Sequence, residues 1–191
     1  MLKRCFKVLT GIVALTLLII SFSAINAHAS SHMRTPIDYH RSSETVPYPS
    51  SQVTHSKDFW VRVRINKCRA YLMKGNRPVY TMYCSAGKLE NKNGKKVSAT
   101  PTGTFHIQEE HGKTFYNPSA KSGGNYYRSW NGHGDYLFHS VPIDKNGNYI
   151  KSEAAKLGKE PASHGCVRLT IADAHWFYQH VPVGTKVVVE N

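Results

Sequence analysis

Acidic residues are scarce in this sequence of 191 residues, in which 12 Asp and Glu stand against 25 Lys and Arg. The formal net charge is +13, and three of the positive charges (Lys3, Arg4 and Lys7) lie in the first seven residues. Without these three, 22 basic minus 12 acidic residues leave +10. A charge this high favours contact with an anionic surface, such as a polyanionic wall or membrane head groups. Because the basic residues are scattered over many segments, nucleic acid is a poorer partner.

Long hydrophobic runs are also missing, with one exception near the N-terminus. Residues 8–25 are largely apolar and uncharged, follow the basic start, and precede Ala27-His28-Ala29. This order predicts a signal peptide over residues 1–29, cleaved after Ala29. The alternative is an uncleaved membrane tether, because the run approaches the length that spans a bilayer. In either case we expect the rest of the chain to lie outside the cytoplasm, where nucleic acid is absent.

Cysteine is rare as well, and the number left after export is odd. Cys5 would leave with the signal peptide, so Cys68, Cys84 and Cys166 remain, and one thiol has no disulfide partner. If a three-residue turn joins the strands that contain Cys68 and Cys84, the two residues face each other. A two-residue turn would direct them to opposite faces. A Cys68–Cys84 disulfide and two buried free thiols are therefore both open, and Cys166 is unpaired in either case.

The rest of the chain divides into two parts. Residues 30–57 are rich in Ser, Thr, Pro and His and lack an apolar period, which predicts a flexible linker. From residue 59 onward, apolar and polar residues alternate, which predicts half-buried strands in a single domain over residues 58–191. We expect a mainly β sandwich or barrel with one or two short helices, and a solvated basic loop at residues 88–98. The predicted strands are residues 59–65, 68–73, 79–84, 104–108, 126–130, 136–141 and 186–189, and the clear helix ends near residue 180.

The densest group of reactive side chains lies at residues 163–169, which read Ser-His-Gly-Cys-Val-Arg-Leu. A cysteine attacks as its thiolate and needs a nearby base or cation. His164 is the neighbouring imidazole, and His139 is a second candidate at the end of an apolar strand. Gly165 leaves the backbone open to a substrate carbonyl, and main-chain N–H groups beside it can stabilise an oxyanion. Arg168 shares the face of the thiol if the segment is extended.

Two non-catalytic roles are compatible with the same residues. A single buried cysteine is usually an inert core residue. Cys166, His133, His139 and His164 are zinc-ligand types, although they lack the close spacing of a zinc site. An export signal, an unpaired thiol, an adjacent glycine and a histidine at a strand end together favour the catalytic interpretation.

These segments resemble the signature of the L,D-transpeptidase catalytic domain, the YkuD-type family. The resemblance rests on residues 163–169 with Phe138-His139-Ser140 upstream, and it covers most of residues 59–190. Other matching pieces are residues 85–87, 100–105, 173–177 and 182–187. The 23 residues between His139 and Ser163 are more than compact family members have, so we expect a different loop over the site.

The resemblance implies a role for each site residue. Cys166 would be the nucleophile, and His139 the base that removes the thiol proton and later returns it. Ser140 would orient this base, often through its backbone carbonyl. His164 and Gly165 would surround the oxyanion. No metal, nucleotide or other cofactor would be required.

The substrate that the resemblance implies is a tetrapeptide stem of peptidoglycan. The enzyme would release the terminal D-alanine, keep the acyl group as a thioester, and pass it to an amine on a neighbouring stem. Arg168 would shape the site or hold the donor peptide. Transfer to water would instead make the protein an L,D-carboxypeptidase. We expect a monomer whose basic surface and linker place it against an anionic cell wall.

Two further interpretations compete with this one. A sortase also uses His, Cys and Arg, but its cysteine ends a Thr-x-Thr-Cys type of strand and its arginine lies far downstream. Here Arg168 is two residues from the cysteine. A non-catalytic wall-binding module would keep the fold but lose the nucleophile or the base, and Cys166 and His139 are both present.

Overall fold

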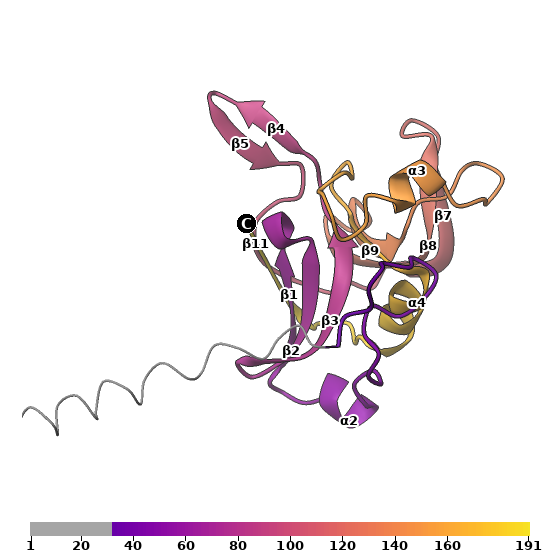
Figure 1. Cartoon of the computed structure of the whole chain (residues 1–191). Coiled ribbons are helices and arrows are strands. Elements are labelled where there is room, and N and C mark those ends of the chain that lie inside the picture. The colour runs from indigo at the N-terminus through magenta and orange to yellow at the C-terminus, as the bar shows by residue number, and fades with distance from the viewer. Residues whose placement is uncertain (1–31) are drawn as a thin grey trace, which may run out of the picture. The chain divides into compact units, whose positions relative to one another are not determined.

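The computed structural model describes residues 32–191, so the predicted signal peptide lies outside the described residues. Within residues 32–191, no helix has the length and apolar character needed to cross a membrane. The described chain forms a curled sheet with a few short helices (Figure 1). The prediction of a mainly β fold is therefore confirmed.

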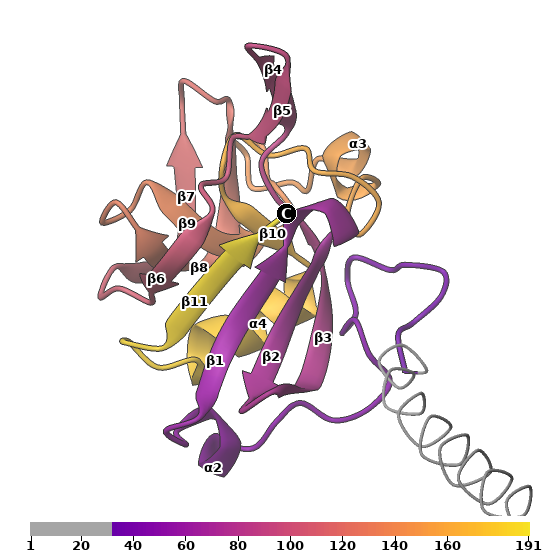
Figure 2. The ribbon, with the colours of Figure 1, turned by 90° about the vertical axis from the view of Figure 1, so that its left-hand side faces the viewer.

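Nine of the eleven strands in the described chain form one sheet, in the order β6-β11-β1-β2-β3-β10-β9-β8-β7 (Figure 2). The remaining two strands form a separate hairpin. Within residues 32–191 the helices are α2 (Ser51–Thr54), α3 (Lys151–Ala154) and α4 (Ile171–His180), with one 3-10 turn at Ile65–Lys67. The strands are β1 (Phe59–Arg64), β2 (Arg69–Lys74), β3 (Arg77–Ser85), β4 (Leu89–Lys92), β5 (Lys95–Ser98), β6 (Gly103–His106), β7 (His111–Asn117), β8 (Ser122–Asn131), β9 (Tyr136–Ser140), β10 (Val167–Leu169) and β11 (Lys186–Glu190).

The core lies between the sheet and α4. Phe59, Val61 and Val63 of β1 are buried and alternate with partly exposed residues, as the period of two predicts. Phe177 of α4 packs against Phe138 of β9, with ring centroids 4.5 Å apart. Burial of each such side chain contributes about 1.5–3 kcal/mol to folding. This packing holds β9, the strand that carries His139, against the helix.

The β2–β3 hairpin decides where Cys68 and Cys84 lie. Its turn has two residues, Gly75 and Asn76, which would direct the cysteines to opposite faces in an unbroken ladder. A bulge in β3 adds one residue and restores the register, so the Cys84 N–H donates to the Cys68 carbonyl at 3.0 Å. Both thiols are nevertheless free. The Cys68 backbone is left-handed (φ 52°), and its thiol donates to the Ile65 carbonyl at 3.6 Å. Of the two outcomes left open, the structure has the pair of buried thiols.

Residues 32–57 pack against the domain, and the prediction of a flexible linker is wrong for this part of the chain. Val46, Tyr48 and Val53 contact the core. The Tyr48 ring stacks on Trp176 of α4 at 4.9 Å, and its hydroxyl donates to the Asp173 carboxylate at 2.8 Å. The three apolar side chains and the hydrogen bond to the buried Asp173 carboxylate fix this segment, although its composition resembles that of a linker.

The same segment completes an edge of β3 that β10 leaves open. β10 has three residues and pairs only with the last two residues of β3. Earlier in β3, the Thr81 N–H donates to the Glu44 carboxylate at 2.9 Å, and the Tyr83 N–H donates to the Ser43 hydroxyl at 2.7 Å. Two side chains thus take the place of a neighbouring strand.

Ser43→Ala is expected to lower the free energy of unfolding by about 2–4 kcal/mol. The hydroxyl accepts from the Tyr83 N–H and donates to the buried Asp173 carboxylate, so its loss leaves two buried groups short of a partner. Ser42→Ala is the matched control, because the Ser42 hydroxyl donates to the Glu44 carbonyl in a partly buried position; it should cost about 1 kcal/mol or less. Urea unfolding of both variants measures the difference. Equal costs would show that this segment is not part of the cooperative fold.

Candidate active site

Two adjacent parallel strands bring Cys166 and His139 to one place. In the register of β9 and β10, Arg168 lies opposite His139, and Cys166 directly precedes β10. Side chains two residues apart on an extended chain share a face. Accordingly, all three residues line one cavity of about 190 Å³. A larger depression of about 580 Å³, beside Trp60 and Pro182, contains none of them.

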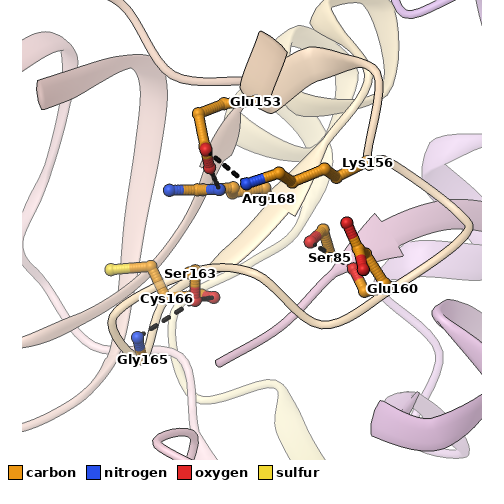
Figure 3. Close-up of polar contacts among 8 residues, drawn as sticks. All are labelled: Ser85, Glu153, Lys156, Glu160, Ser163, Gly165, Cys166 and Arg168. Carbon is orange, nitrogen blue, oxygen red and sulfur yellow. Dashed lines mark hydrogen bonds and ion pairs between the residues drawn. The ribbon is translucent and has the colours of Figure 1, made fainter. Parts of the chain in front are cut away.

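Hydrogen bonds fix the turn that precedes β10. The Ser163 hydroxyl donates to the Cys166 carbonyl at 2.6 Å and accepts from the Gly165 N–H at 3.0 Å (Figure 3). The Thr100 hydroxyl donates to the Gly165 carbonyl at 2.6 Å. Gly165 has a φ of 152°, and a Cβ there would lie 2.8 Å from the Tyr136 ring, so only glycine fits. The Gly165 N–H bonds to Ser163 within the turn, so among the main-chain N–H groups expected near the oxyanion this one already has a partner.

His139 is buried deep in the cavity, with 4% of its surface exposed. Its ring meets Phe115 edge-on, with centroids 5.1 Å apart. Burial, and then the charge of Arg168, lower the pKa of His139 to about 3, while the main chain of Ser140 opposes the shift. The Nδ1 atom has no well-aligned hydrogen bond within residues 32–191. His139 is therefore neutral near pH 7 and able to accept a proton.

The Cys166 thiol lines the same cavity, and the residue is only partly buried. The atoms packed around the sulfur nevertheless raise the pKa of Cys166, and the charge of Asp135 raises it further. The Leu137 backbone and Arg168 act in the opposite direction. The direction of both pKa shifts therefore favours the neutral thiol and the neutral imidazole in this cavity.

Arg168 is 5% exposed and is already paired with an acid. Its Nη1 lies 2.6 Å from the Glu153 carboxylate, which also lies 2.6 Å from Lys156 Nζ (Figure 3). Arg168 was expected to shape the site or to hold the donor peptide, and its Nη1 is engaged by Glu153. Glu153 comes from α3, in the long segment between His139 and Ser163, and nothing in its local sequence marks it as a site residue.

The other predicted residues are not equally close to the chemistry. His164 is exposed and lines the cavity at its mouth. Ser140 does not line the cavity, and its hydroxyl donates to the Val141 carbonyl and accepts from the Asn125 N–H. The Ser140 side chain thus joins β9 to β8, and its link to His139 is through the main chain.

His133 does not join the other histidines. Its Nδ1 lies 2.8 Å from the Glu110 carboxylate, and 77% of its side chain is exposed. Across residues 32–191, no three His, Cys, Asp or Glu side chains are grouped closely enough to hold a metal ion. In the structure, Cys166, His133, His139 and His164 are therefore not arranged as four ligands of one zinc ion.

Gly124 of β8 determines the position of the base, which sequence reasoning missed. A Cβ at this position would lie 2.2 Å from His139 Nδ1, so an alanine must displace the imidazole or β8. Gly124→Ala is therefore expected to lower the rate of Cys166 acylation about 100-fold, as misplacement of a catalytic group by about 1 Å does. Gly184→Ala is the control for backbone strain, since Gly184 has a positive φ (81°), but a Cβ there meets nothing within 4 Å and the residue lies outside the cavity. Equal acylation rates in intact-mass time courses would contradict this role.

The sequence matches a known protein family and two relatives. The family model of the YkuD L,D-transpeptidase catalytic domain matches residues 58–189. "Putative L,D-transpeptidase YciB" of Bacillus subtilis (strain 168) is 37% identical over 196 residues, covering 93% of this chain and 96% of that protein. "Probable L,D-transpeptidase 3" of Mycobacterium tuberculosis is 28% identical over 108 residues, covering 55% of this chain and 39% of that protein.

Solved structures show the same fold. An L,D-transpeptidase from Mycobacterium tuberculosis H37Rv superposes with a TM-score of 0.52 at 19% identity, covering 70% of this chain and 58% of that chain. The L,D-transpeptidase LdtMt1 in complex with imipenem gives a TM-score of 0.52 at 20% identity, covering 70% of this chain and 59% of that chain. This chain thus spans less than two thirds of these solved chains. From the family match and the close relative, the chain belongs to the L,D-transpeptidase catalytic-domain family.

Proposed function

We propose that this protein transfers a peptide acyl group through a thioester on Cys166, with His139 as the base. One observation carries the proposal: a partly accessible thiol and a buried, neutral imidazole line the same small cavity. A neutral imidazole accepts the thiol proton as the sulfur attacks. The raised pKa of the thiol and the lowered pKa of the imidazole make this transfer costly before substrate binds.

The reaction proceeds in two halves. The Cys166 sulfur bonds to the carbonyl carbon while its proton passes to His139, and the carbonyl oxygen becomes an oxyanion. The Cys166 main-chain N–H and the His164 imidazole at the cavity mouth stabilise that oxyanion. The C–N bond then breaks, and His139 returns the proton to the leaving amine. In the second half, an acceptor amine attacks the thioester carbonyl carbon and loses a proton to His139. The oxyanion then collapses, the C–S bond breaks to release the new amide, and His139 returns the proton to the Cys166 sulfur.

The donor that we propose is a peptidoglycan tetrapeptide stem, with the terminal D-alanine as leaving group and an amine of a neighbouring stem as acceptor. Membership of the L,D-transpeptidase family supports this choice. A structure of similar fold has been solved in complex with imipenem, so we also expect carbapenems to acylate Cys166. Residues 1–29 would export the protein to the cell wall, where its excess of basic residues favours anionic surfaces.

Muropeptide analysis tests the proposal directly. The protein is incubated with purified disaccharide-tetrapeptides, and the products are separated by mass. We expect dimers joined between third stem residues, with one D-alanine released per dimer. Release of D-alanine without dimers would identify an L,D-carboxypeptidase. The absence of both, with folded and reduced protein, would refute the proposed function.

A further inference from the structure

The β4–β5 hairpin stands apart from the sheet. It was predicted to be a solvated loop, but residues 89–98 form two paired strands that project from the rest of the described fold (Figures 1 and 2). Asn93 and Gly94 have positive φ values of 53° and 78°, which are typical of the tightest hairpin turns. Most of its residues are exposed, including Leu89 and Val97, which are 39% and 42% exposed.

The hairpin carries an unbalanced positive charge. Lys88 lies 3.4 Å from Glu90, the single acid of the hairpin. Lys92 and Lys95 lie directly opposite each other, and Lys96 follows; within the described chain none of the three forms an ion pair. Opposed like charges destabilise a strand pair, and an isolated two-stranded hairpin is marginally stable in water. A bound anion at this tip would remove the repulsion.

Both strands of the hairpin are anchored to the catalytic turn. The Lys88 N–H donates to the Ser163 carbonyl at 2.9 Å, and the Ala99 N–H donates to the Lys88 carbonyl at 3.0 Å. The Thr100 hydroxyl accepts from the Gly87 N–H at 2.7 Å and donates to the Gly165 carbonyl at 2.6 Å. The base of the hairpin therefore lies beside the catalytic turn, and its two strands lead outward from there to the lysines of the tip.

The size of the cavity leaves most of a peptide substrate outside. Its volume of about 190 Å³ is below the roughly 300–1,000 Å³ of sites that enclose a drug-sized ligand. Lys92 lies four residues beyond Lys88 along β4, which is about 13 Å at the rise of a strand. That distance matches about four extended residues, so the tip of the hairpin reaches groups at the far end of a tetrapeptide.

We propose that the β4–β5 hairpin binds the free carboxylates of peptidoglycan stem peptides that lie outside the cavity, with the facing pair Lys92 and Lys95 as the ligands. This inference rests on the proposed function and names a surface that selects its substrate. Surface lysines that contact carboxylates contribute modestly one by one, and together they hold the stem beside Cys166.

Binding is measured by sedimentation with purified peptidoglycan from which phosphodiester polymers have been removed, on a Cys166→Ala background that prevents turnover. Lys92→Gln/Lys95→Gln is expected to raise the Kd about three- to tenfold, as the loss of two exposed charge contacts predicts. Lys74→Gln/Arg77→Gln is the matched control, because these two basic residues also oppose each other across a two-residue turn, on the β2–β3 hairpin. The control should change the Kd less than twofold. Equal effects of the two variants would overturn the proposal.

Three further arms identify the ligand and separate the two proposals. Amidation of the peptidoglycan carboxylates should remove the difference between Lys92→Gln/Lys95→Gln and the control; if the difference persists, carboxylates are not the ligand. Binding that requires the phosphodiester polymers would also overturn the proposal. With Cys166 present, Lys92→Gln/Lys95→Gln should raise KM for disaccharide-tetrapeptides while kcat is kept. Failure of the unsubstituted protein to release D-alanine or form dimers, with the binding difference intact, would contradict the proposed reaction alone.

Discussion

Cys166→Ala is expected to abolish both the covalent adduct with a carbapenem and the formation of muropeptide dimers. Without the sulfur, no group in the cavity forms the thioester, and removal of a nucleophile typically costs about 10⁴-fold or more in rate. Intact-mass spectrometry after carbapenem incubation measures the adduct, and the muropeptide assay measures turnover. The unsubstituted protein should gain one adduct mass.

Cys68→Ala is the matched control for this experiment. Cys68 is a buried thiol 2% exposed, outside the cavity, and it donates to a backbone carbonyl. The variant should keep one adduct and near-normal turnover if it folds, which circular dichroism verifies. A full adduct on folded Cys166→Ala would place the nucleophile elsewhere and contradict the proposed reaction.

His139→Gln is expected to lower turnover by about 10²–10⁴-fold, the usual contribution of a general base. Glutamine preserves much of the volume of the buried ring but does not accept the thiol proton. His164→Gln, at the exposed mouth of the cavity, should cost about 10-fold, as loss of a partial oxyanion contact. A larger loss for His164→Gln than for His139→Gln would reverse the assignment of the base.

The pH dependence of alkylation gives a second readout on the same pair. Because burial raises the pKa of Cys166, reaction with iodoacetamide should rise at a higher pH than for an ordinary cysteine.

The lowered pKa of His139 makes the free energy of unfolding depend on pH in the acid range. The unfolded imidazole binds a proton below pH 6.5 and the folded one only near pH 3, so stability is lost as the pH falls through this window. His139→Gln should remove that part of the acid destabilisation, and an unchanged acid profile would contradict the burial of a neutral histidine.

The strands that alternate between core and solvent could be predicted from the sequence, and others could not. β1 shows a clear period of two, and its bounds agree with the prediction to one residue. β7 is an edge strand with no buried residue, so its pattern resembles that of a loop. β10 has three residues, too few to show any period. In the β2–β3 hairpin, the two-residue turn shifts the strand pairing by one residue relative to a three-residue turn, and the bulge in β3 shifts it back. No local sequence signal marks this bulge.

The site residues that belong to short sequence motifs could be predicted from the sequence. Cys166, His139 and His164 lie in short, recognisable segments, and the structure brings them to one cavity. Glu153 was not predictable, because its role depends on the path of α3 over Arg168 and not on neighbouring residues. Gly124 was missed for a similar reason, since its contact with the base crosses from β8 to β9.

The hydrogen bonds that Ser43 and Glu44 make to β3 have a practical consequence for truncation. Both the change in sequence pattern and the family match place the start of the domain at residue 58. A chain cut there would leave the N–H groups of Thr81 and Tyr83 unpaired on an open strand edge. Such an edge invites strand addition from a second molecule, and with it aggregation. We therefore expect a chain that avoids this aggregation to include Ser43 and Glu44, which lie well before the catalytic domain that the family pattern delimits.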